Sequence, residues 1–335
     1  MAIISRTPVR ISFGGGGTDL ASYYEKYGGL VVSAAINKYF YTILELRDDD
    51  RIQLISSDLQ LNQTVKDFYD LKFGEGFDIP TAVIKHFNIQ RGMNLFLASE
   101  VPPGTGLGSS GALAVNTVNL LNHLERKEMG KKEIAETAYS IGFNDLKLPI
   151  GKQDEYASAF GGINFIRFEK DNVKVEPLKL SNETRKRMEE DILLFFTGRT
   201  RESSQILTVQ NRLCREDDRR TIETLHILKK LGEEMKNAVE KGDLGHFGEL
   251  MHESWMKKKN LVNGITNENI DQAYNTALKH DAVGGKILGA GGGGYLLLYC
   301  ERKHQENVRK ALHDMEFREL NFKFDMKGTS ILGEW

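Results

Sequence analysis

The chain has few cysteines and no segment of the kind that crosses a membrane. Its 335 residues include only Cys214 and Cys300, too few for a disulfide framework or a cysteine metal site. No apolar run reaches the roughly 18 residues that a membrane-spanning helix needs. The N-terminal residues 1–8 also lack the basic start and apolar core of a secretion signal. We therefore expect a cytoplasmic protein without a membrane partner.

The chain also lacks an excess of charge of either sign. It has 45 lysines and arginines against 47 aspartates and glutamates, a formal net charge of -2. Without a positive surplus, binding to nucleic acid or to an acidic membrane surface is disfavoured. A hydrophobic content of 40% is typical of a globular protein, and the length favours two domains.

Periodic patterns predict strands mainly in the first half of the chain and helices mainly in the second. Strand-like alternation occupies residues 3–13, 30–46 and 92–101, and helical periodicity begins at 110–124. The second half contains the apolar helical positions Ile222, Leu225, Leu228, Leu231, Met235, Leu244, Phe247, Leu250, Met251 and Trp255. The mixture predicts an α+β protein, with a strand-rich domain over residues 1–175 and a helix-rich α+β domain over residues 176–335.

Two shorter segments of the second half carry expectations of their own. The three lysines at 257–259 follow a helical stripe and are expected to be a solvated helix end. Residues 321–327 are expected to form a strand near the C-terminus.

The most informative segment is the glycine-rich turn Pro-Pro-Gly-Thr-Gly-Leu-Gly-Ser-Ser-Gly at residues 102–111. It follows an apolar run and leads directly into a helical pattern. Its glycines allow a positive φ and a close approach to a ligand, and the helix start offers unpaired N–H groups. This combination suits a phosphate chain.

The familiar nucleotide-binding loops fit this turn poorly. Residues 106–111 match G-x-G-x-x-G, but Pro102 and Pro103 interrupt the preceding strand, and the acid expected at the end of a second strand is missing. No Walker A sequence occurs, because Gly151 and Lys152 are followed by glutamine. The protein-kinase H-R-D signature is absent as well.

Two further glycine clusters flank this central loop in sequence. Residues 6–20 form an alternating strand that runs into four glycines, a threonine and Asp19. Residues 286–300 hold five glycines between a short apolar run and a strand-like run. Four adjacent glycines cost conformational entropy on folding, so their recurrence indicates close backbone approach to a ligand or to another segment.

The three clusters, in this order and spacing, resemble the three motifs of the GHMP small-molecule kinases, a superfamily that includes galactokinase, homoserine kinase and mevalonate kinase. The resemblance covers nearly the whole chain. Residues 7–19 and the segment Gly-Lys-Gln-Asp-Glu-Tyr at 151–156 are most similar to the D-glycero-D-manno-heptose 7-phosphate kinases and their fucokinase-like relatives. The resemblance implies the two-domain GHMP kinase fold, whose N-terminal domain is like the second domain of ribosomal protein S5.

The resemblance also implies how the nucleotide is held. The central loop would bind the phosphates of ATP through its backbone N–H groups. Ser110, with Ser109 as a second candidate, would bring a hydroxyl to Mg²⁺. The residues expected to bind the cofactor are Pro103, Gly104, Thr105, Gly106, Leu107, Gly108, Ser109, Ser110 and Gly111.

The resemblance assigns the chemical step to Asp154 and Arg10. Asp154 matches the aspartate that faces the acceptor hydroxyl, where it would act as a base or as an aligning anion. Arg10 would lower the pKa of that hydroxyl and stabilise the Asp154 charge.

The acceptor is expected to contact the first and third glycine clusters and a set of cations. Asp19 would accept hydrogen bonds from sugar hydroxyls, and the third cluster would close over the site from the second domain. Arg199 and Arg201, at a strand end before a helix, are candidates for an anionic group, with Lys152 as a further one. The expected substrate-binding residues are Gly16, Gly17, Thr18, Asp19, Lys152, Arg199, Arg201, Gly291 and Gly292.

One position departs from the family pattern. Many members carry a glutamate for Mg²⁺ about twelve residues before the catalytic aspartate, and this chain has Gly142 there. Either Asp145 replaces it or water completes the metal shell.

The resulting interpretation is an ATP- and Mg²⁺-dependent kinase that phosphorylates the anomeric hydroxyl of D-glycero-D-manno-heptose 7-phosphate. The alternatives are a fucokinase- or galactokinase-like enzyme for an unphosphorylated sugar, a catalytically silent sugar or nucleotide sensor on the same fold, and a dehydrogenase. The sequence leaves the oligomeric state open.

Overall fold

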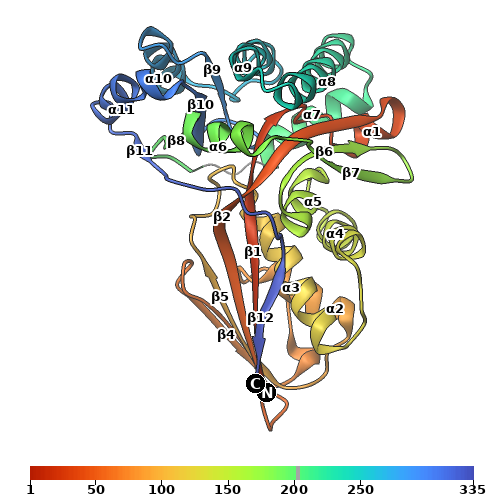
Figure 1. The fold of residues 1–335 in the computed structure, drawn as a ribbon. Coiled ribbons are helices and arrows are strands. Elements are labelled where there is room, and N and C mark those ends of the chain that lie inside the picture. Colours follow the sequence, from red (N-terminus) through yellow and green to blue (C-terminus); the bar gives the residue numbers. More distant parts are fainter. Residues whose placement is uncertain (201–203) are drawn as a thin grey trace.

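The computed structural model describes residues 1–200 and 204–335, which form two regions of sheet and helix (Figure 1). The first region is built on an eight-stranded sheet in the order β12-β1-β2-β5-β3-β4, with β6 paired to β2 and β7 to β6. Its strands are β1 (Ala2–Gly14), β2 (Gly29–Leu46), β3 (Ile52–Ser56), β4 (Leu61–Val65), β5 (Met93–Ser99), β6 (Ile163–Phe168), β7 (Val173–Pro177) and β12 (Ser330–Glu334).

The two longest strands, β1 and β2, connect the two regions. They pair antiparallel from Ala2 opposite Glu45 to Gly14 opposite Val32. One half of β2 pairs with β5 and the other half with β6. Both strands run from the lower end of the molecule up to the helices of the second region (Figure 1). The glycine turn after Gly14 is therefore delivered to the boundary between the regions.

Helices cover one face of the first sheet. The central one, α3, packs against β1 and β2 through the buried residues Val115, Val118 and Leu121. Its buried Asn116 donates a hydrogen bond of 2.7 Å to the carbonyl oxygen of Phe40 on β2. The helical elements of this region are α1 (Ala21–Tyr27), η1 (Phe68–Asp70), α2 (Asp78–Phe87), α3 (Ser109–Leu124), α4 (Lys131–Ser140), the π-helical turn η2 (Ile141–Asp145) and α5 (Gln153–Phe160).

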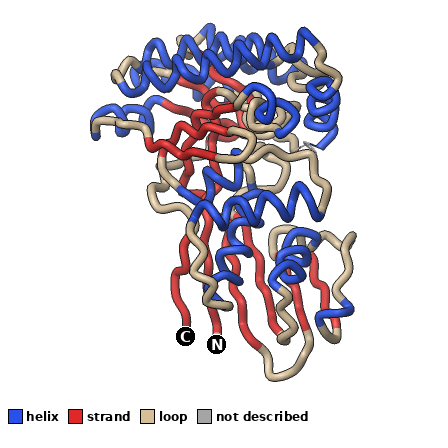
Figure 2. The backbone as a smooth tube through the Cα atoms, turned by 90° about the vertical axis from the view of Figure 1, so that its right-hand side faces the viewer, coloured by secondary structure: helices blue, strands red, loops and turns tan. Residues whose placement is uncertain are grey.

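The second region has a four-stranded antiparallel sheet in the order β11-β8-β10-β9, with helices packed over it (Figure 2). Asp218 and Asp243 cap α8 and α9 by accepting hydrogen bonds from Thr221 N and His246 N. The elements are α6 (Asn182–Asp191), β8 (Ile192–Phe196), α7 (Ser204–Arg215), α8 (Arg219–Glu240), α9 (Leu244–Lys258), α10 (Glu268–Lys279), β9 (Gly284–Ile287), β10 (Tyr295–Tyr299), η3 (Arg302–His304), α11 (Gln305–His313) and β11 (Arg318–Glu319).

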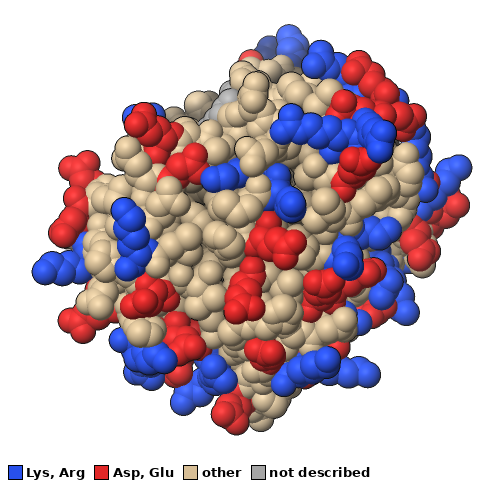
Figure 3. Space-filling model, turned by 90° about the horizontal axis from the view of Figure 1, so that it is seen from above, with Lys and Arg blue, Asp and Glu red and all other residues tan. Residues whose placement is uncertain are grey.

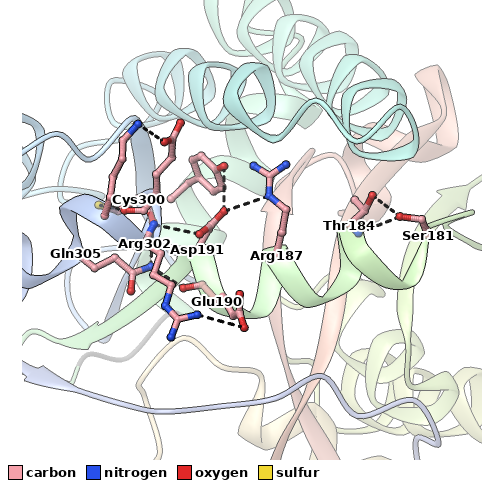
Figure 4. Close-up of polar contacts among 11 residues, drawn as sticks. Ser181, Thr184, Arg187, Glu190, Asp191, Cys300, Arg302 and Gln305 are labelled. Carbon is pink, nitrogen blue, oxygen red and sulfur yellow. Dashed lines mark hydrogen bonds and ion pairs between the residues drawn. The ribbon is translucent and has the colours of Figure 1, made fainter.

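A polar cluster at the end of α6 holds this second sheet to its flanking elements (Figure 4). The Asp191 carboxylate accepts hydrogen bonds from Arg302 N at 3.2 Å and from the Tyr299 hydroxyl at 3.4 Å. Its carbonyl oxygen accepts a hydrogen bond from Cys300 N at 2.8 Å. The Gln305 amide donates to the carbonyl oxygen of Cys300 at 2.9 Å. These contacts join the end of α6 to β10, η3 and the start of α11.

The α+β class expected from the sequence is confirmed, and one predicted element is wrong. Residues 321–327 form no strand; Phe324 makes only an isolated bridge to Ile36, because Asp325 bonds to backbone N–H groups of its own turn. The domain boundary at residue 175 remains a prediction. β7 spans this boundary, and the C-terminal β12 pairs with β1 in the first sheet, which brings the two termini side by side (Figure 1).

The surface carries both signs of charge. Seen from above, acidic and basic side chains alternate over the visible face without a large patch of one sign (Figure 3). Within residues 1–200 and 204–335, no helix is long and apolar enough to cross a membrane.

The contact between the regions depends on buried aromatic rings. The Phe247 ring on α9 lies edge-on to Phe13 of β1, with centroids 5.4 Å apart, and to Tyr299 of β10 at 6.1 Å. We expect Phe247→Ala to lower the free energy of unfolding by about 3–5 kcal/mol, because it leaves a cavity between the two sheets. Phe73→Ala, at a half-exposed ring, is the control and should change it little. Chemical denaturation measures the free energy of unfolding of both variants. Equal losses would contradict the assignment of Phe247 to the contact between the regions.

Candidate active site

The site is organised by an ion pair between β1 and α5. Arg10 donates through Nε to Asp154 Oδ1 at 2.7 Å, and its Nη2 lies 2.5 Å from the same oxygen. Its Nη1 donates to the carbonyl oxygen of Gly106 at 2.5 Å. The Arg10 side chain is 3% exposed and that of Asp154 is 27% exposed. The guanidinium is therefore held on two sides, while the carboxylate still reaches a cavity.

The central glycine loop lies directly over this pair. Gly104, Gly106 and Gly108 have φ values of 72°, 80° and 75°. A β-carbon at Gly108 would stand 3.1 Å from Asp154 Oδ2 and 3.3 Å from Arg10 Cζ. Both the backbone angle and the lack of space therefore require glycine at this position.

The start of α3 is free of side-chain caps. Gly108 is the N-cap residue, and no side chain forms a capping hydrogen bond there. Ser109 and Ser110, which follow it, both line the cavity. The N–H groups of the first helical turn and the two hydroxyls are thus available to an anion.

The first glycine turn places a buried carboxylate beside the ion pair. Asp19 Oδ1 accepts a hydrogen bond from Gly17 N at 2.8 Å. A β-carbon at Gly151 would stand only 2.1 Å from Asp19 Oδ2, so the segment before Asp154 packs against Asp19. Burial raises the pKa of Asp19, and the nearby Asp154 carboxylate adds to the shift.

The third glycine cluster closes the site from the second region. A β-carbon at Gly289 would lie 2.8 Å from the Cα of Gly106, so the central and third clusters touch through glycine backbone. Tyr295 N donates to the carbonyl oxygen of Thr105 at 3.1 Å and extends this contact.

One cavity unites these parts. Among the residues expected from the sequence, it is lined by Arg10, Gly17, Asp19, Gly104, Gly106, Gly108, Ser109, Ser110, Gly111, Asp154 and Gly291. The other described residues of that set do not line it: Pro103, Thr105, Leu107, Gly16, Thr18, Lys152, Arg199 and Gly292. Arg201 lies outside the described residues.

Several of these residues have structural partners instead. The Thr18 hydroxyl donates to the carbonyl oxygens of Gly15 and Leu30 and so holds the first turn. Buried Leu107 accepts a hydrogen bond from Arg10 N through its carbonyl oxygen. Gly292 N donates to the carbonyl oxygen of Ile265 at 2.8 Å.

Two of the expected anion-binding cations are not available in the cavity. Lys152 Nζ bonds to both carboxylate oxygens of Glu136 at 2.8 Å and lies over the Tyr139 ring. Arg199 is exposed. Neither residue lines the cavity, and Lys152 is already paired with Glu136.

The structure corrects the expectation for the lysines at 257–259. Lys257 is exposed, but Lys258 is buried, lines the cavity and donates from Nζ to the carbonyl oxygen of Gly289 at 3.1 Å. The signal was present in the sequence. Lys258 continues the apolar stripe of α9 at a spacing of three residues from Trp255.

Sequence reasoning also missed residues with buried polar groups. Gln210 on α7 donates from Nε2 to the carbonyl oxygen of Gly17 at 3.1 Å, which places α7 over the first turn. Glu155 is buried beside Asp154; burial, then the Asp154 charge, raises its pKa well above the ordinary value. Lys286 on β9 is also buried. Gln210 did carry a signal, since it lies four residues from both Ile206 and Cys214 on the buried stripe of α7. No such pattern marks Glu155 or Lys286.

The residues present fit a metal held mainly by a nucleotide. The described residues contain no cluster of three or more His, Cys, Asp or Glu side chains that could hold an ion. Gly142 does line the cavity, whereas Asp145 is exposed and does not. Asp145 is therefore not placed to replace the missing family glutamate, and Ser110 is the hydroxyl available at the loop.

Comparison with known proteins shows the family. The GHMP kinases N terminal domain matches residues 78–162, and the GHMP kinases C terminal domain matches residues 235–316. A D-glycero-alpha-D-manno-heptose 7-phosphate kinase from Campylobacter jejuni is 32% identical over 333 residues, covering 98% of each chain. The chain therefore belongs to the GHMP kinases, and the two-domain fold expected from the sequence is confirmed.

Several proteins that match this chain over most of its length are sugar kinases by name. The crystal structure of a D-glycero-D-manno-heptose 1-phosphate kinase from Bacteroides thetaiotaomicron matches it with a TM-score of 0.82 and 27% identity, covering 99% of each chain. An L-fucokinase/L-fucose-1-P guanylyltransferase from Bacteroides fragilis is 27% identical over 92% of this chain and 35% of that longer protein.

The buried amine of Lys258 makes stability depend on pH. Burial lowers the pKa of Lys258 from 10.5 to about 8, and the Asp19 charge opposes this shift. Between these values the unfolded chain binds more protons, so this group makes the folded state more stable as pH rises, and its destabilising effect is fully present below pH 8. We expect Lys258→Met to raise the free energy of unfolding relative to the parent at about pH 7, with the difference shrinking towards about pH 10.

Urea unfolding of the parent and the variant at both pH values measures this difference. Lys257→Met removes an exposed amine from the same helix and serves as the control, with a difference near zero throughout. A Lys258→Met difference independent of pH would show that the buried amine does not titrate in this range.

Proposed function

We propose that this protein transfers the γ-phosphoryl group of ATP to the anomeric hydroxyl of D-glycero-D-manno-heptose 7-phosphate, which yields the 1,7-bisphosphate. The observation that carries this proposal is the Arg10–Asp154 pair beneath the glycine loop, in a cavity that also contains buried Asp19. The loop supplies groups for the phosphates, and the pair supplies groups for the acceptor hydroxyl.

The nucleotide would lie along the start of α3. N–H groups of the loop and of the first helical turn would bind its phosphates, aided by the positive end of the helix dipole. A second cavity is also lined by Ser109 and Ser110, and its lining includes Pro103, Phe77 and Leu97 but not Asp154. Its apolar side chains suit a nucleotide base.

Magnesium would be held by Ser110 together with phosphate oxygens and water. This set matches the preference of Mg²⁺ for a few protein oxygens. The metal would supply charge neutralisation at the phosphates.

Asp154 would align the anomeric hydroxyl and receive its proton or its hydrogen bond. Arg10 keeps this carboxylate in one orientation through the two contacts to Oδ1, and its bond to Gly106 ties that orientation to the phosphate loop. Acceptor and phosphoryl group would therefore be aligned by one connected unit. An intact pair argues against the catalytically silent alternative.

The acceptor is the part of the proposal on which the relatives differ. The Campylobacter relative is named for a 7-phosphate, the Bacteroides thetaiotaomicron structure for a 1-phosphate kinase, and the Bacteroides fragilis relative for L-fucose. We favour the 7-phosphate, because the Campylobacter relative has the highest sequence identity to this chain of these three proteins. ADP release with heptose 7-phosphate, heptose 1-phosphate, free fucose, galactose and mannose separates the alternatives, and preference for a free sugar would support the fucokinase-like one.

Asp154 can be tested by an isosteric change. We expect Asp154→Asn to lower kcat by about 10²-fold or more while ATP still binds, because the amide keeps the shape but loses the charge that orients the hydroxyl. Asp145→Asn, at the exposed aspartate of η2, should retain parental activity. Steady-state kinetics and ATP calorimetry measure both; a kcat within a few-fold of the parent would remove Asp154 from the mechanism.

The loop can be tested by a side chain that it has no room for. Gly108→Val should abolish ATP binding in a folded protein, since its φ of 75° disfavours a β-branched residue and its β-carbon would crowd Asp154 and Arg10. Gly74→Val is the matched control, with a φ of 95° but no atom within 4 Å of its β-carbon. Calorimetry with ATP on variants checked by circular dichroism decides this; unchanged affinity would make the loop a structural turn only.

A further inference from the structure

Two buried amines and a buried hydroxyl meet behind the first glycine turn. A β-carbon at Gly16 would lie 3.6 Å from Lys258 Nζ, 3.6 Å from Ser12 Oγ and 3.9 Å from Lys286 Nζ. The three side chains come from α9, β1 and β9, so both regions of the molecule contribute. Each of the three residues is no more than 7% exposed.

These three groups have few hydrogen-bond or ion-pair partners within the described protein. Ser12 Oγ has no hydrogen-bond partner among the described residues. Lys258 donates to a carbonyl oxygen, and within residues 1–200 and 204–335 neither lysine forms an ion pair with a carboxylate. Placing two ammonium groups side by side in the interior is costly unless an anion compensates them. The Asp19 carboxylate favours the charge on both amines, but among the described residues it forms no ion pair with either of them, and burial outweighs its effect on their pKa values.

The cluster lies close to the reacting groups but apart from them. Ser12 follows Arg10 by two residues in a regular part of β1, so the two side chains share one face about 7 Å apart along the strand. Lys258 lines the same cavity as Asp19 and Asp154, whereas Ser12 and Lys286 do not line it and reach it only through their closeness to Gly16 and Lys258. The phosphate loop covers Arg10 and Asp154, whereas the amines stand at the first turn. A sugar with its hydroxyl at Asp154 could direct its far end to the amines.

We propose that Lys258, Lys286 and Ser12 form the subsite that binds the phosphate group already present on the acceptor sugar. This inference rests on the proposed function, in that it assumes a phosphorylated sugar as acceptor. The phosphate dianion would accept hydrogen bonds from both amines and from the hydroxyl, and these charge-assisted bonds would offset the burial of the charges. Lys152 and Arg199, the described residues expected to do this from the sequence, are neutralised or exposed.

Binding and kinetics of charge-removing variants test the subsite. Lys258→Met and Lys286→Met should each raise the Kd and KM for heptose 7-phosphate at least tenfold, equivalent to about 1.4 kcal/mol. The Kd for ATP and the weak use of the unphosphorylated heptose should stay within about twofold, since neither ligand places a phosphate there. Lys257→Met, at the exposed neighbour on the same helix, should leave all of these values unchanged.

The possible outcomes separate the sources of the phosphate. A matching loss of ATP affinity in Lys258→Met would assign the amines to the nucleotide, and equal damage to free and phosphorylated heptose would reduce them to structural groups; either result overturns the subsite. Should Lys258→Met fail to fold by circular dichroism, Lys258→Gln keeps the donor to Gly289 while removing the charge, and Lys286→Met tests the cluster independently.

The subsite and the proposed function fail in different ways. A parent protein that uses the phosphorylated sugar, with lysine variants that bind it equally well, overturns the subsite alone. A parent protein that phosphorylates free sugars and does not bind heptose 7-phosphate overturns both.

Discussion

The ion pair between Arg10 and Asp154 is the interaction on which the rest of the site depends. It joins the middle of β1 to the start of α5, and the same guanidinium binds the carbonyl oxygen of Gly106 in the central loop. A sheet strand, a helix and the central glycine loop are thereby fixed to one side chain. Because the arginine is almost fully buried, loss of its partner would leave an uncompensated charge in the interior, which is strongly unfavourable.

Glycine makes the assembly around that pair possible. The central and third clusters meet where Gly106 and Gly289 pack backbone against backbone, and Gly151 lies against the Asp19 carboxylate. A β-carbon at any of these three positions would come within 3 Å of a neighbouring atom. The recurrence of glycine in the sequence therefore reflects segments packed against one another as well as room for a ligand.

The charges of the site form an unequal set. Arg10 is matched by Asp154, and Asp19 is buried with a raised pKa. Burial, and then the charge of Lys258, lowers the pKa of Lys286 well below its ordinary value. Buried groups with displaced pKa values commonly gather where a protein binds charged ligands. Here they gather around one cavity at the boundary of the two regions, which is the expected place for a ligand that both regions contact.

The sequence by itself determined the family and the α+β class, and it singled out Arg10, Asp19 and Asp154, which the structure places together in one cavity. These predictions rest on local patterns, which can be recognised without knowledge of the fold. The patterns are the glycine turns, the strand alternation and the residues around Arg10 and Asp154. Only the tertiary structure decided which cations face the cavity. Lys152 became the partner of Glu136, and Lys258 became buried, because burial and ion pairing depend on elements that are distant in sequence. The sequence does not distinguish a lysine surrounded by water from one that faces a carboxylate or a second amine in the folded protein.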